Sequence, residues 1–249
     1  GNPMFPQSLE EKLGRMLDSL DRFMIGTEFV YKIGDIDRAE ATRPDLDDSG
    51  WEKLANRALK RDQGVTWVRA RFTVPEFCLD VPVAGSQLRV MTETGHAVFA
   101  PLEVYIDGRL ALAERSWMDF KCPEGIVSEG AEPGRSHTVA FRFDFNEKCY
   151  WLNSFSLKVI SDAVEKCAMH IRSIMEELKH MEHFEGAAAP LSRAYEMLEE
   201  AADTGSVLAV RKAEGECRAL FEGFRAAVKR NKVYLVGHAH IDMNWFWSM

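Results

Sequence analysis

Residues 102–113, LEVYIDGRLALA, set the fold class of this chain. Alternating apolar residues on both sides of Asp107-Gly108 predict two antiparallel strands, and this dipeptide is the strongest short-range signal for the turn of a β-hairpin. The same period of two recurs at 67–74 and at 139–145, VAFRFDF. Residues 66–159 are therefore expected to form an antiparallel β-sandwich.

Helical patterns lie on both sides of this predicted sandwich. Residues 8–24 place their leucines on one face, with Ser8 as the expected capping residue. The polar stretch 33–63 predicts an irregular connection that contains a short helical turn near 51–59. Beyond the sandwich, three amphipathic stretches predict a helical hairpin; they are 162–184, 190–202 and 206–229.

The carboxy-terminal residues 232–249, KVYLVGHAHIDMNWFWSM, contain the strongest chemical signal. Their apolar beginning predicts a buried strand, in which alternation would place His238, His240 and Asp242 on one face. Imidazole nitrogen and carboxylate oxygen are ligands that a catalytic zinc ion accepts. Such side chains can also form structural hydrogen bonds at the end of a strand, but the longer pattern HxHxDxxW favours a metal site.

The segment 236–247, VGHAHIDMNWFW, resembles the opening strand motif of the family 38 glycoside hydrolases, the retaining zinc-dependent α-mannosidases, in particular their bacterial and cytosolic-type branch. The resemblance implies that His240 and Asp242 are zinc ligands and that Trp245 forms part of the wall against which the mannose ring packs. Three further positions match without an implied ligand role: His238, Asn244 and Trp247. In that family the nucleophilic aspartate and another histidine ligand come from much later in the chain.

The whole pattern predicts an α+β chain that forms the amino-terminal portion of a larger enzyme hydrolysing terminal α-mannosides. The sandwich resembles a jelly-roll module of the galactose-binding type, and similar modules precede the catalytic domain in the bacterial branch of the family. This portion is expected to be inactive alone, because the nucleophile and remaining zinc ligands would lie downstream. The expected parts are a helix and irregular lead-in over 1–63, a sandwich over 64–160, a helical region over 161–230, and the first strand of a truncated α/β barrel over 231–249.

Two other functions stay open at this point. An amidohydrolase-type metal enzyme also places an HxH pair on its first barrel strand, although it does not account for the indoles at Trp245 and Trp247. A metallo-β-lactamase motif would require histidine after Asp242, where this chain has Met243. The other open function is a noncatalytic carbohydrate-recognition or assembly module.

Other aromatic and histidine residues are weaker candidates for a functional site. An exposed indole can stack on a sugar, but such residues are more often buried; the candidates in the predicted sandwich are Trp67, Trp117 and Trp151. The remaining histidines lack a metal-binding pattern and are expected to have no functional role; they are His96, His137, His170, His180 and His183.

Composition narrows the class of protein further. The chain of 249 residues has a net charge of -8 with scattered basic residues, which argues against a nucleic-acid partner. No apolar stretch reaches the length of a membrane span, and no signal-peptide core is visible, so a cytoplasmic location is expected. Five cysteines without a CxxC pair predict reduced thiols. Homo-oligomers are compatible with this composition.

Overall fold

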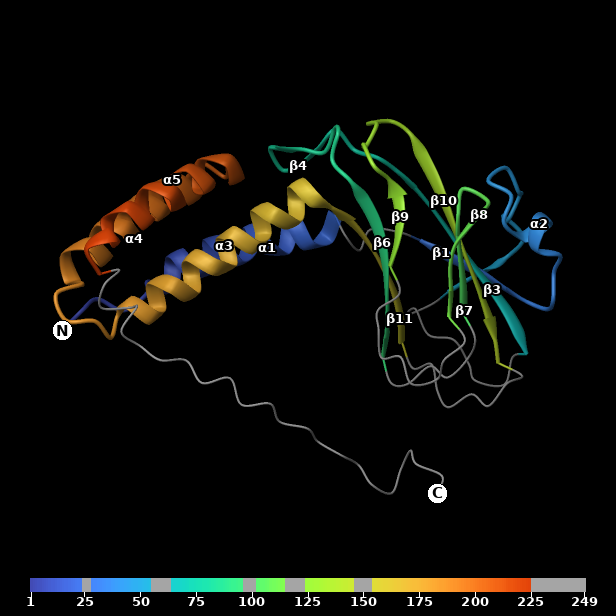
Figure 1. Cartoon of the computed structure of the whole chain (residues 1–249), viewed down its shortest axis with the longest axis horizontal. Coiled ribbons are helices and arrows are strands. Elements are labelled where there is room, and N and C mark those ends of the chain that lie inside the picture. The colour runs from blue at the N-terminus through green and yellow to red at the C-terminus, as the bar shows by residue number, and fades with distance from the viewer. Residues whose placement is uncertain (24–27, 55–63, 96–101, 115–123, 146–153, 225–249) are drawn as a thin grey trace, which may run out of the picture.

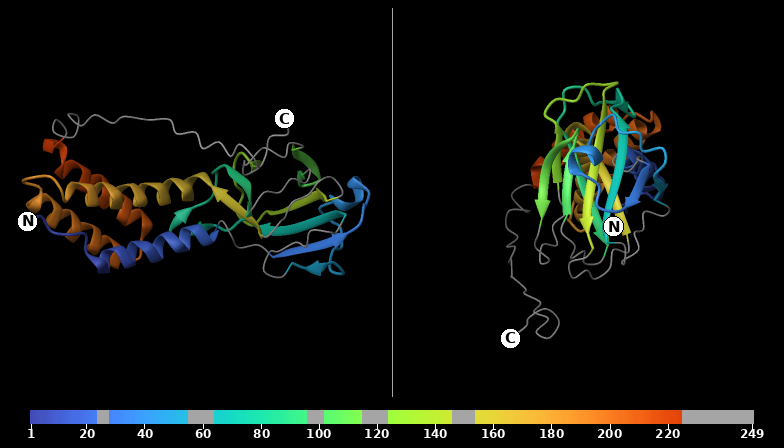
Figure 2. Two further views of the ribbon diagram at one scale, coloured as in Figure 1. Left: turned by 90° about the horizontal axis from the view of Figure 1, so that it is seen from below. Right: turned by 90° about the vertical axis from the view of Figure 1, so that its right-hand side faces the viewer.

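The structure is a computed structural model that describes residues 1–23, 28–54, 64–95, 102–114, 124–145 and 154–224. It is an elongated α+β molecule with a group of long helices at one end and antiparallel sheets at the other (Figure 1). A second view shows the same elongated shape, with the amino terminus at the end of the helices that lies away from the sheets (Figure 2). The α+β class and the antiparallel sheets are as predicted, whereas the predicted barrel strand in 231–249 lies outside the described residues.

The larger sheet has six strands in the order β2-β1-β3-β10-β7-β8. β3 and β10 form its middle and pair along their whole length, from Thr73 opposite Ser136 to Val65 opposite Asp144. The strands are β1 (Phe29–Ile33), β2 (Glu52–Lys53), β3 (Val65–Thr73), β7 (Leu102–Ile106), β8 (Arg109–Glu114) and β10 (Ser136–Asp144).

The hairpin predicted from Asp107-Gly108 is confirmed. β7 and β8 pair as antiparallel neighbours on either side of this dipeptide. Asp107 and Gly108 have φ of 49° and 79°, and positive φ at both central residues matches the twist that two antiparallel strands require.

A smaller sheet faces the larger one and has the order β11-β6-β9. Its strands are β6 (Leu88–Gly95), β9 (Glu124–Ser128) and β11 (Ser154–Ser161). Val90 and Val159 from this sheet join Val68, Val139 and Phe141 from the larger sheet in one buried cluster. A separate two-stranded hairpin, β4 (Phe77–Cys78) with β5 (Val81–Pro82), lies between the sheets and the helices.

The described part of the segment 33–63 is mostly irregular, as its polarity predicts, and residues 55–63 lie outside the described residues. It contains the short helix α2 (Arg38–Ala41) and the strand β2, so residues 52 and 53 do not form the predicted helical turn. β2 is an exposed edge strand, and the Tyr31 hydroxyl donates a 2.6 Å hydrogen bond to Glu52 across the pair. Edge strands tolerate polar residues because they bury little surface, which explains why the hydrophobic pattern missed this one.

The helices form a four-helix bundle, not the predicted hairpin with a separate lead-in helix. α1 packs against α3 and α4, and α5 packs against the same two helices. The bundle consists of α1 (Gln7–Phe23), α3 (Asp162–Met181), α4 (Ala188–Asp203) and α5 (Val207–Leu220), followed by the 3-10 turn η2 (Glu222–Phe224).

The amino-terminal helix fits this bundle through one apolar stripe. Its buried residues are Leu9, Leu13, Met16 and Leu20. The predicted cap at Ser8 is wrong, because the helix already begins at Gln7 and the Ser8 hydroxyl instead donates a 2.8 Å hydrogen bond to Glu199 of α4.

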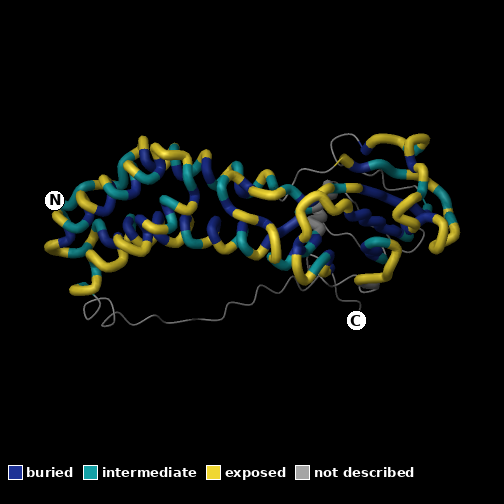
Figure 3. Tube along the Cα trace, turned by 90° about the horizontal axis from the view of Figure 1, so that it is seen from above, coloured by how far each residue is buried: buried dark blue, intermediate teal, exposed yellow. Residues whose placement is uncertain are grey.

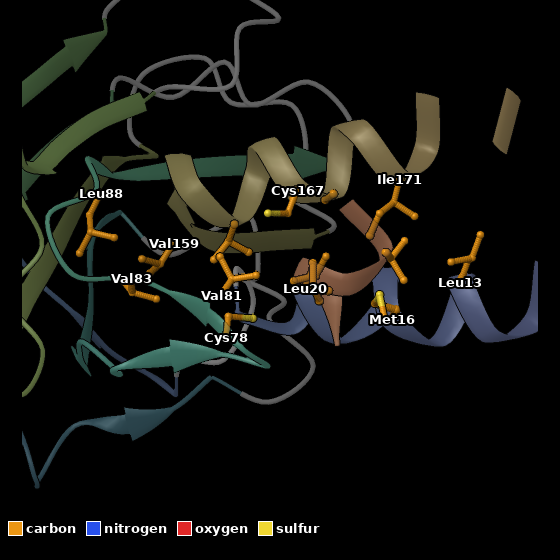
Figure 4. Close-up of a cluster of buried hydrophobic side chains, with 14 of the residues drawn as sticks. Leu13, Met16, Leu20, Cys78, Val81, Val83, Leu88, Val159, Cys167 and Ile171 are labelled. Atoms are coloured by element: carbon orange, nitrogen blue, oxygen red, sulfur yellow. The ribbon is translucent and has the colours of Figure 1, made fainter. Parts of the chain in front are cut away.

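One apolar core runs through both ends of the molecule. Buried residues lie along the inside of the bundle and between the sheets (Figure 3). At the junction the cluster joins Leu20 of α1 and Cys167 of α3 to Cys78 and Val81 of the β4–β5 hairpin (Figure 4). The sandwich and the bundle are therefore packed against each other as one body.

Substitution of Gly125 should reveal how closely the edges of the two sheets approach each other. A Cβ atom at Gly125 in β9 would lie 2.8 Å from Cδ1 of Ile106 and 3.3 Å from Cβ of Ala111, both in the larger sheet. We expect Gly125→Ala to lower the free energy of unfolding by about 1 kcal/mol, at the lower end of overpacking costs, because the terminal methyl of Ile106 can shift whereas Cβ of Ala111 cannot move without its backbone. Gly130→Ala is the matched control, since a Cβ there meets nothing closer than 4.0 Å. Equal urea midpoints for the two variants would contradict this packing.

Candidate functional site

The residues predicted to bind metal and substrate cannot be placed. His240, Asp242 and Trp245 lie outside the described residues, as do the other matching positions of the segment 236–247. Among the residues that the structure does describe, no group of three or more histidine, cysteine, aspartate or glutamate side chains could hold a metal ion. The candidate zinc site therefore stays a prediction from the sequence.

Trp67, the candidate sugar platform that falls among the described residues, is buried. Its side chain is 0% exposed and packs beside Tyr105, with 5.9 Å between ring centroids. Ile36, Ala41 and Trp51 cover this side of the larger sheet. Trp67 thus belongs to a second small core and is not available to stack on a sugar. Trp117 and Trp151 lie outside the described residues.

A buried arginine holds this covering segment on the sheet. Arg69 of β3 is 0% exposed and donates a 2.8 Å hydrogen bond from Nε to Oδ2 of Asp48, and it also donates to the carbonyls of Ala41 and Arg43. Burial lowers the pKa of Arg69, and the carboxylate of Asp48 opposes that shift. Arg71 binds the other Asp48 oxygen at 2.8 Å. Arg69, Arg71 and Asp48 form an ion-pair network that replaces the hydration these charges lose on burial. The hydrogen bonds that Arg69 donates go to groups of the protein itself.

A second pair of charges fixes the edge of the same covering segment. Arg38 makes two hydrogen bonds of 2.8 and 2.9 Å to the carboxylate of Glu103 on β7. This contact, supported by the Tyr105 hydroxyl at 2.7 Å, lowers the pKa of Glu103 to about 2 against the opposing effect of burial. Glu103 is therefore ionised at neutral pH and is not poised as a general acid.

His137 has a partner that the sequence did not reveal. Its Nδ1 lies 2.7 Å from Oδ2 of Asp107, and the other Asp107 oxygen accepts a 2.9 Å hydrogen bond from the amide of Thr138. A carboxylate can orient a histidine in this way for catalysis or metal binding. Here the ring packs on Phe72 at 5.5 Å, and Nε2 is buried without a hydrogen-bond partner among the described residues. The pair anchors the β7–β8 turn to β10. His96 lies outside the described residues.

The histidines of the helices differ from one another. His180 and His183 are exposed. His170 is not simply solvated, because its Nδ1 lies 3.0 Å from the buried carboxylate of Glu214 on α5. Arg211 and Arg218 approach the same carboxylate at 3.3 and 2.9 Å. This cluster neutralises one buried charge between α3 and α5 and is structural.

A cavity of about 200 Å³ lies where α1 meets the sandwich. Arg22 and Phe23 line it from the helix, and Phe72, Val74 and Leu88 are among the residues that line it from the sheets. Sites for small molecules usually enclose roughly 300–1,000 Å³ and contain several converging polar groups. This cavity is smaller and mostly apolar, so it does not qualify as a substrate site.

Three cysteines are described, and all three are free and buried: Cys78, Cys167 and Cys217. Burial raises the pKa of Cys78 and of Cys217 to about 11, and it also raises the pKa of Cys167. Thiols of this kind are weak nucleophiles at neutral pH. Cys122 and Cys149 lie outside the described residues.

Comparison with known proteins adds structural similarities at low identity. A glycosyl hydrolase family 2 member from Bacteroides cellulosilyticus is 17% identical, with a TM-score of 0.39 over 55% of this chain and 20% of that one. A β-glycosidase from Bacteroides vulgatus is 14% identical, with a TM-score of 0.40 over 55% and 19%. The β-glucuronidase of Faecalibacterium prausnitzii is 21% identical, with a TM-score of 0.36 over 48% and 20%.

This chain thus spans about a fifth of the length of the solved structures that it matches. No protein-family model matches it, and no curated protein matches it. At these identities and TM-scores the similarities assign neither a family nor an activity. None of the described helices combines the length and apolar composition needed to cross a membrane.

Loss of the Arg69 guanidinium should be far more costly than loss of its neighbour. Arg69→Met would remove one of the two guanidinium groups that bind the carboxylate of Asp48, a residue that is only 8% exposed. We expect the free energy of unfolding to fall by about 3 kcal/mol or more, as when a buried ion pair is broken on one side. Arg71→Met removes a half-exposed partner of the same carboxylate and should cost about 1 kcal/mol or less. Urea unfolding measures both, and equal losses would refute the burial argument.

The native protein should protect its buried thiols from alkylation. Because the pKa of Cys78 and of Cys217 is about 11, few thiolates form at pH 8, and both sulfurs are shielded from solvent. We expect iodoacetamide to label these two residues roughly a hundredfold more slowly in the native than in the urea-unfolded protein. An added exposed thiol, Ser49→Cys, should react at similar rates in both states. Peptide mass spectrometry separates the sites, and fast native labelling of Cys78 would contradict the packing.

Proposed function

We propose that this chain is the amino-terminal portion of a retaining zinc-dependent α-mannosidase. The observation that carries the proposal is the motif HxHxDxxW at 238–245, which combines two kinds of zinc ligand with an indole. Amidohydrolase-type enzymes share the first histidine pair but do not need Trp245. A sugar-binding site does need such an indole, because the apolar face of a sugar packs well on an aromatic ring.

Three residues of the motif would have roles in this proposal. His240 and Asp242 would hold the zinc ion, and Trp245 would contact the mannose ring. A bound zinc ion supplies a Lewis acid that grips sugar hydroxyls and favours ring distortion. Asp242 is assigned to the metal and not to nucleophilic attack, because retention requires a second carboxylate about 5 Å away and none is tied to this motif.

The described part of the chain would serve as the scaffold of this enzyme. Trp67 is buried, and two charged groups of the larger sheet, Arg69 and Glu103, are paired with Asp48 and Arg38 of the segment that covers it. These features favour a packing role for the sandwich over sugar binding by the sandwich itself. The substrate in this proposal is a terminal α-mannoside, and a cytoplasmic location would suit the free thiols.

Zinc and mannosidase activity should disappear together in the intact protein. We expect a chelator to abolish hydrolysis of 4-nitrophenyl α-mannoside, and His240→Ala to lower kcat/KM at least about a hundredfold while bound zinc falls. Trp245→Ala should raise KM and leave the zinc content unchanged. His183→Ala is the matched control, since His183 is an exposed histidine just after α3.

Three outcomes decide between the open functions. Mannoside hydrolysis that survives both the chelator and His240→Ala excludes the zinc role. Bound zinc with amide hydrolysis and no mannoside hydrolysis would indicate an amidohydrolase-type enzyme. Binding of mannosides without zinc and without hydrolysis would indicate a recognition module.

A further inference from the structure

The β4–β5 hairpin and the strand β11 are two parts of the sandwich half that reach the helical bundle. The hairpin is the one that lies next to α5 through Asp80. It contacts α1 through β4 and α3 through β5. Cys78 and Val81 point into the shared core beside Leu20 (Figure 4), and the Cys78 thiol lies 3.7 Å from the carbonyl of Ser19 on α1. The hairpin is closed by the amide of Val83, which donates to the carbonyl of Glu76 at 3.0 Å.

The turn of this hairpin has an unusual backbone. Leu79 has φ of 54°, in the left-handed region, and its side chain is about half exposed. This conformation is unfavourable for leucine, and its exposed side chain gains little from packing. What the turn does achieve is the placement of the next residue, Asp80, against the start of α5.

Asp80 binds the beginning of α5 with both carboxylate oxygens. Its Oδ1 accepts a 2.7 Å hydrogen bond from the amide of Val207, and its Oδ2 accepts from the Ser206 hydroxyl at 2.6 Å and from the amide of Leu208 at 3.3 Å. The helix also has its own cap, because the Ser206 hydroxyl accepts a 2.9 Å hydrogen bond from the amide of Ala209. The start of α5 is therefore capped twice, once from within and once from a residue 126 positions away.

The charge of Asp80 suits this position. A carboxylate is favourable at the positive end of a helix. Burial would raise the pKa of Asp80, but the hydrogen bonds from Ser206, Val207 and Leu208 outweigh that effect and lower the pKa. The carboxyl group is consequently ionised at neutral pH, when its three hydrogen bonds are strongest.

We propose that Asp80 is a latch that locks the helical bundle onto the sandwich by holding the first turn of α5. Ordinary capping would be satisfied by Ser206 alone, whereas Asp80 ties α5 to the same hairpin that is buried against α1 and α3. The latch fixes the direction of α5, the last described α-helix before the segment that, in the sequence, carries His240 and Asp242. Only that last consequence rests on the proposed function.

Hydrogen exchange and small-angle X-ray scattering on the full chain test the latch. We expect Asp80→Ala to raise amide exchange about tenfold at Val207 and Leu208, to raise it also at Val83 in the hairpin, and to increase the radius of gyration. Ser206→Ala is the comparison variant: it removes the helix's own cap and one of the three bonds to Asp80, but it leaves the bonds from the amides of Val207 and Leu208 to Asp80. It should raise exchange at Ala209 while the hairpin and the scattering profile stay unchanged.

The proposal is overturned if Asp80→Ala behaves like Ser206→Ala, with faster exchange confined to α5. If Asp80→Ala does not fold, Asp80→Asn serves instead, because an amide nitrogen cannot accept the bonds that Oδ2 accepts. It should produce the same changes at smaller size, and unchanged hairpin exchange and scattering would again overturn the latch. Neither measurement uses enzymatic activity, so failure of the α-mannosidase proposal would leave the result of this test intact.

Discussion

The apolar contact between the β4–β5 hairpin and the helices α1 and α3 is the constraint on which the rest of the structure depends. Leu20, Val81 and Ile171 are almost completely buried there, in the same cluster as the interior of the sandwich. A small β-sandwich and a bundle of four helices each bury limited surface alone. By sharing one core, the two halves gain the burial that holds both in place.

Local patterns predicted the parts of the fold that depend on neighbouring residues. The β7–β8 hairpin follows from Asp107-Gly108, because its turn needs two consecutive residues with positive φ. The three helices after the sandwich follow from their apolar period, and the glycines Gly186 and Gly205 that separate them also have positive φ. In each case the information lies within about twenty residues of chain.

Local sequence patterns do not identify contacts between segments that are far apart in the chain. The bundle needs α1 beside α3, which begins about 140 residues later, and an amphipathic stripe does not name its partner. Arg69 and Arg71 likewise look like the solvent-facing residues of an alternating strand. Arg69 is fully buried instead, because Asp48 and the surrounding carbonyls cover it. An alternating sequence pattern shows that a strand has two different faces, but it does not show that a polar face is also buried.

The charged pairs that hold the fold together and the residues with candidate catalytic chemistry lie in different parts of the chain. Among the described residues, the histidine and carboxylate groups that come together have structural tasks: Asp107 with His137 anchors a turn, and Glu214 with His170 neutralises a helix interface. Their local geometry resembles catalytic pairs, but the ring of Phe72 packs against His137, and Arg211 and Arg218 bind the carboxylate of Glu214. Residues that combine ligand chemistry with an aromatic wall occur instead in 238–245, so the functional argument depends on that short pattern and not on the shape of the scaffold.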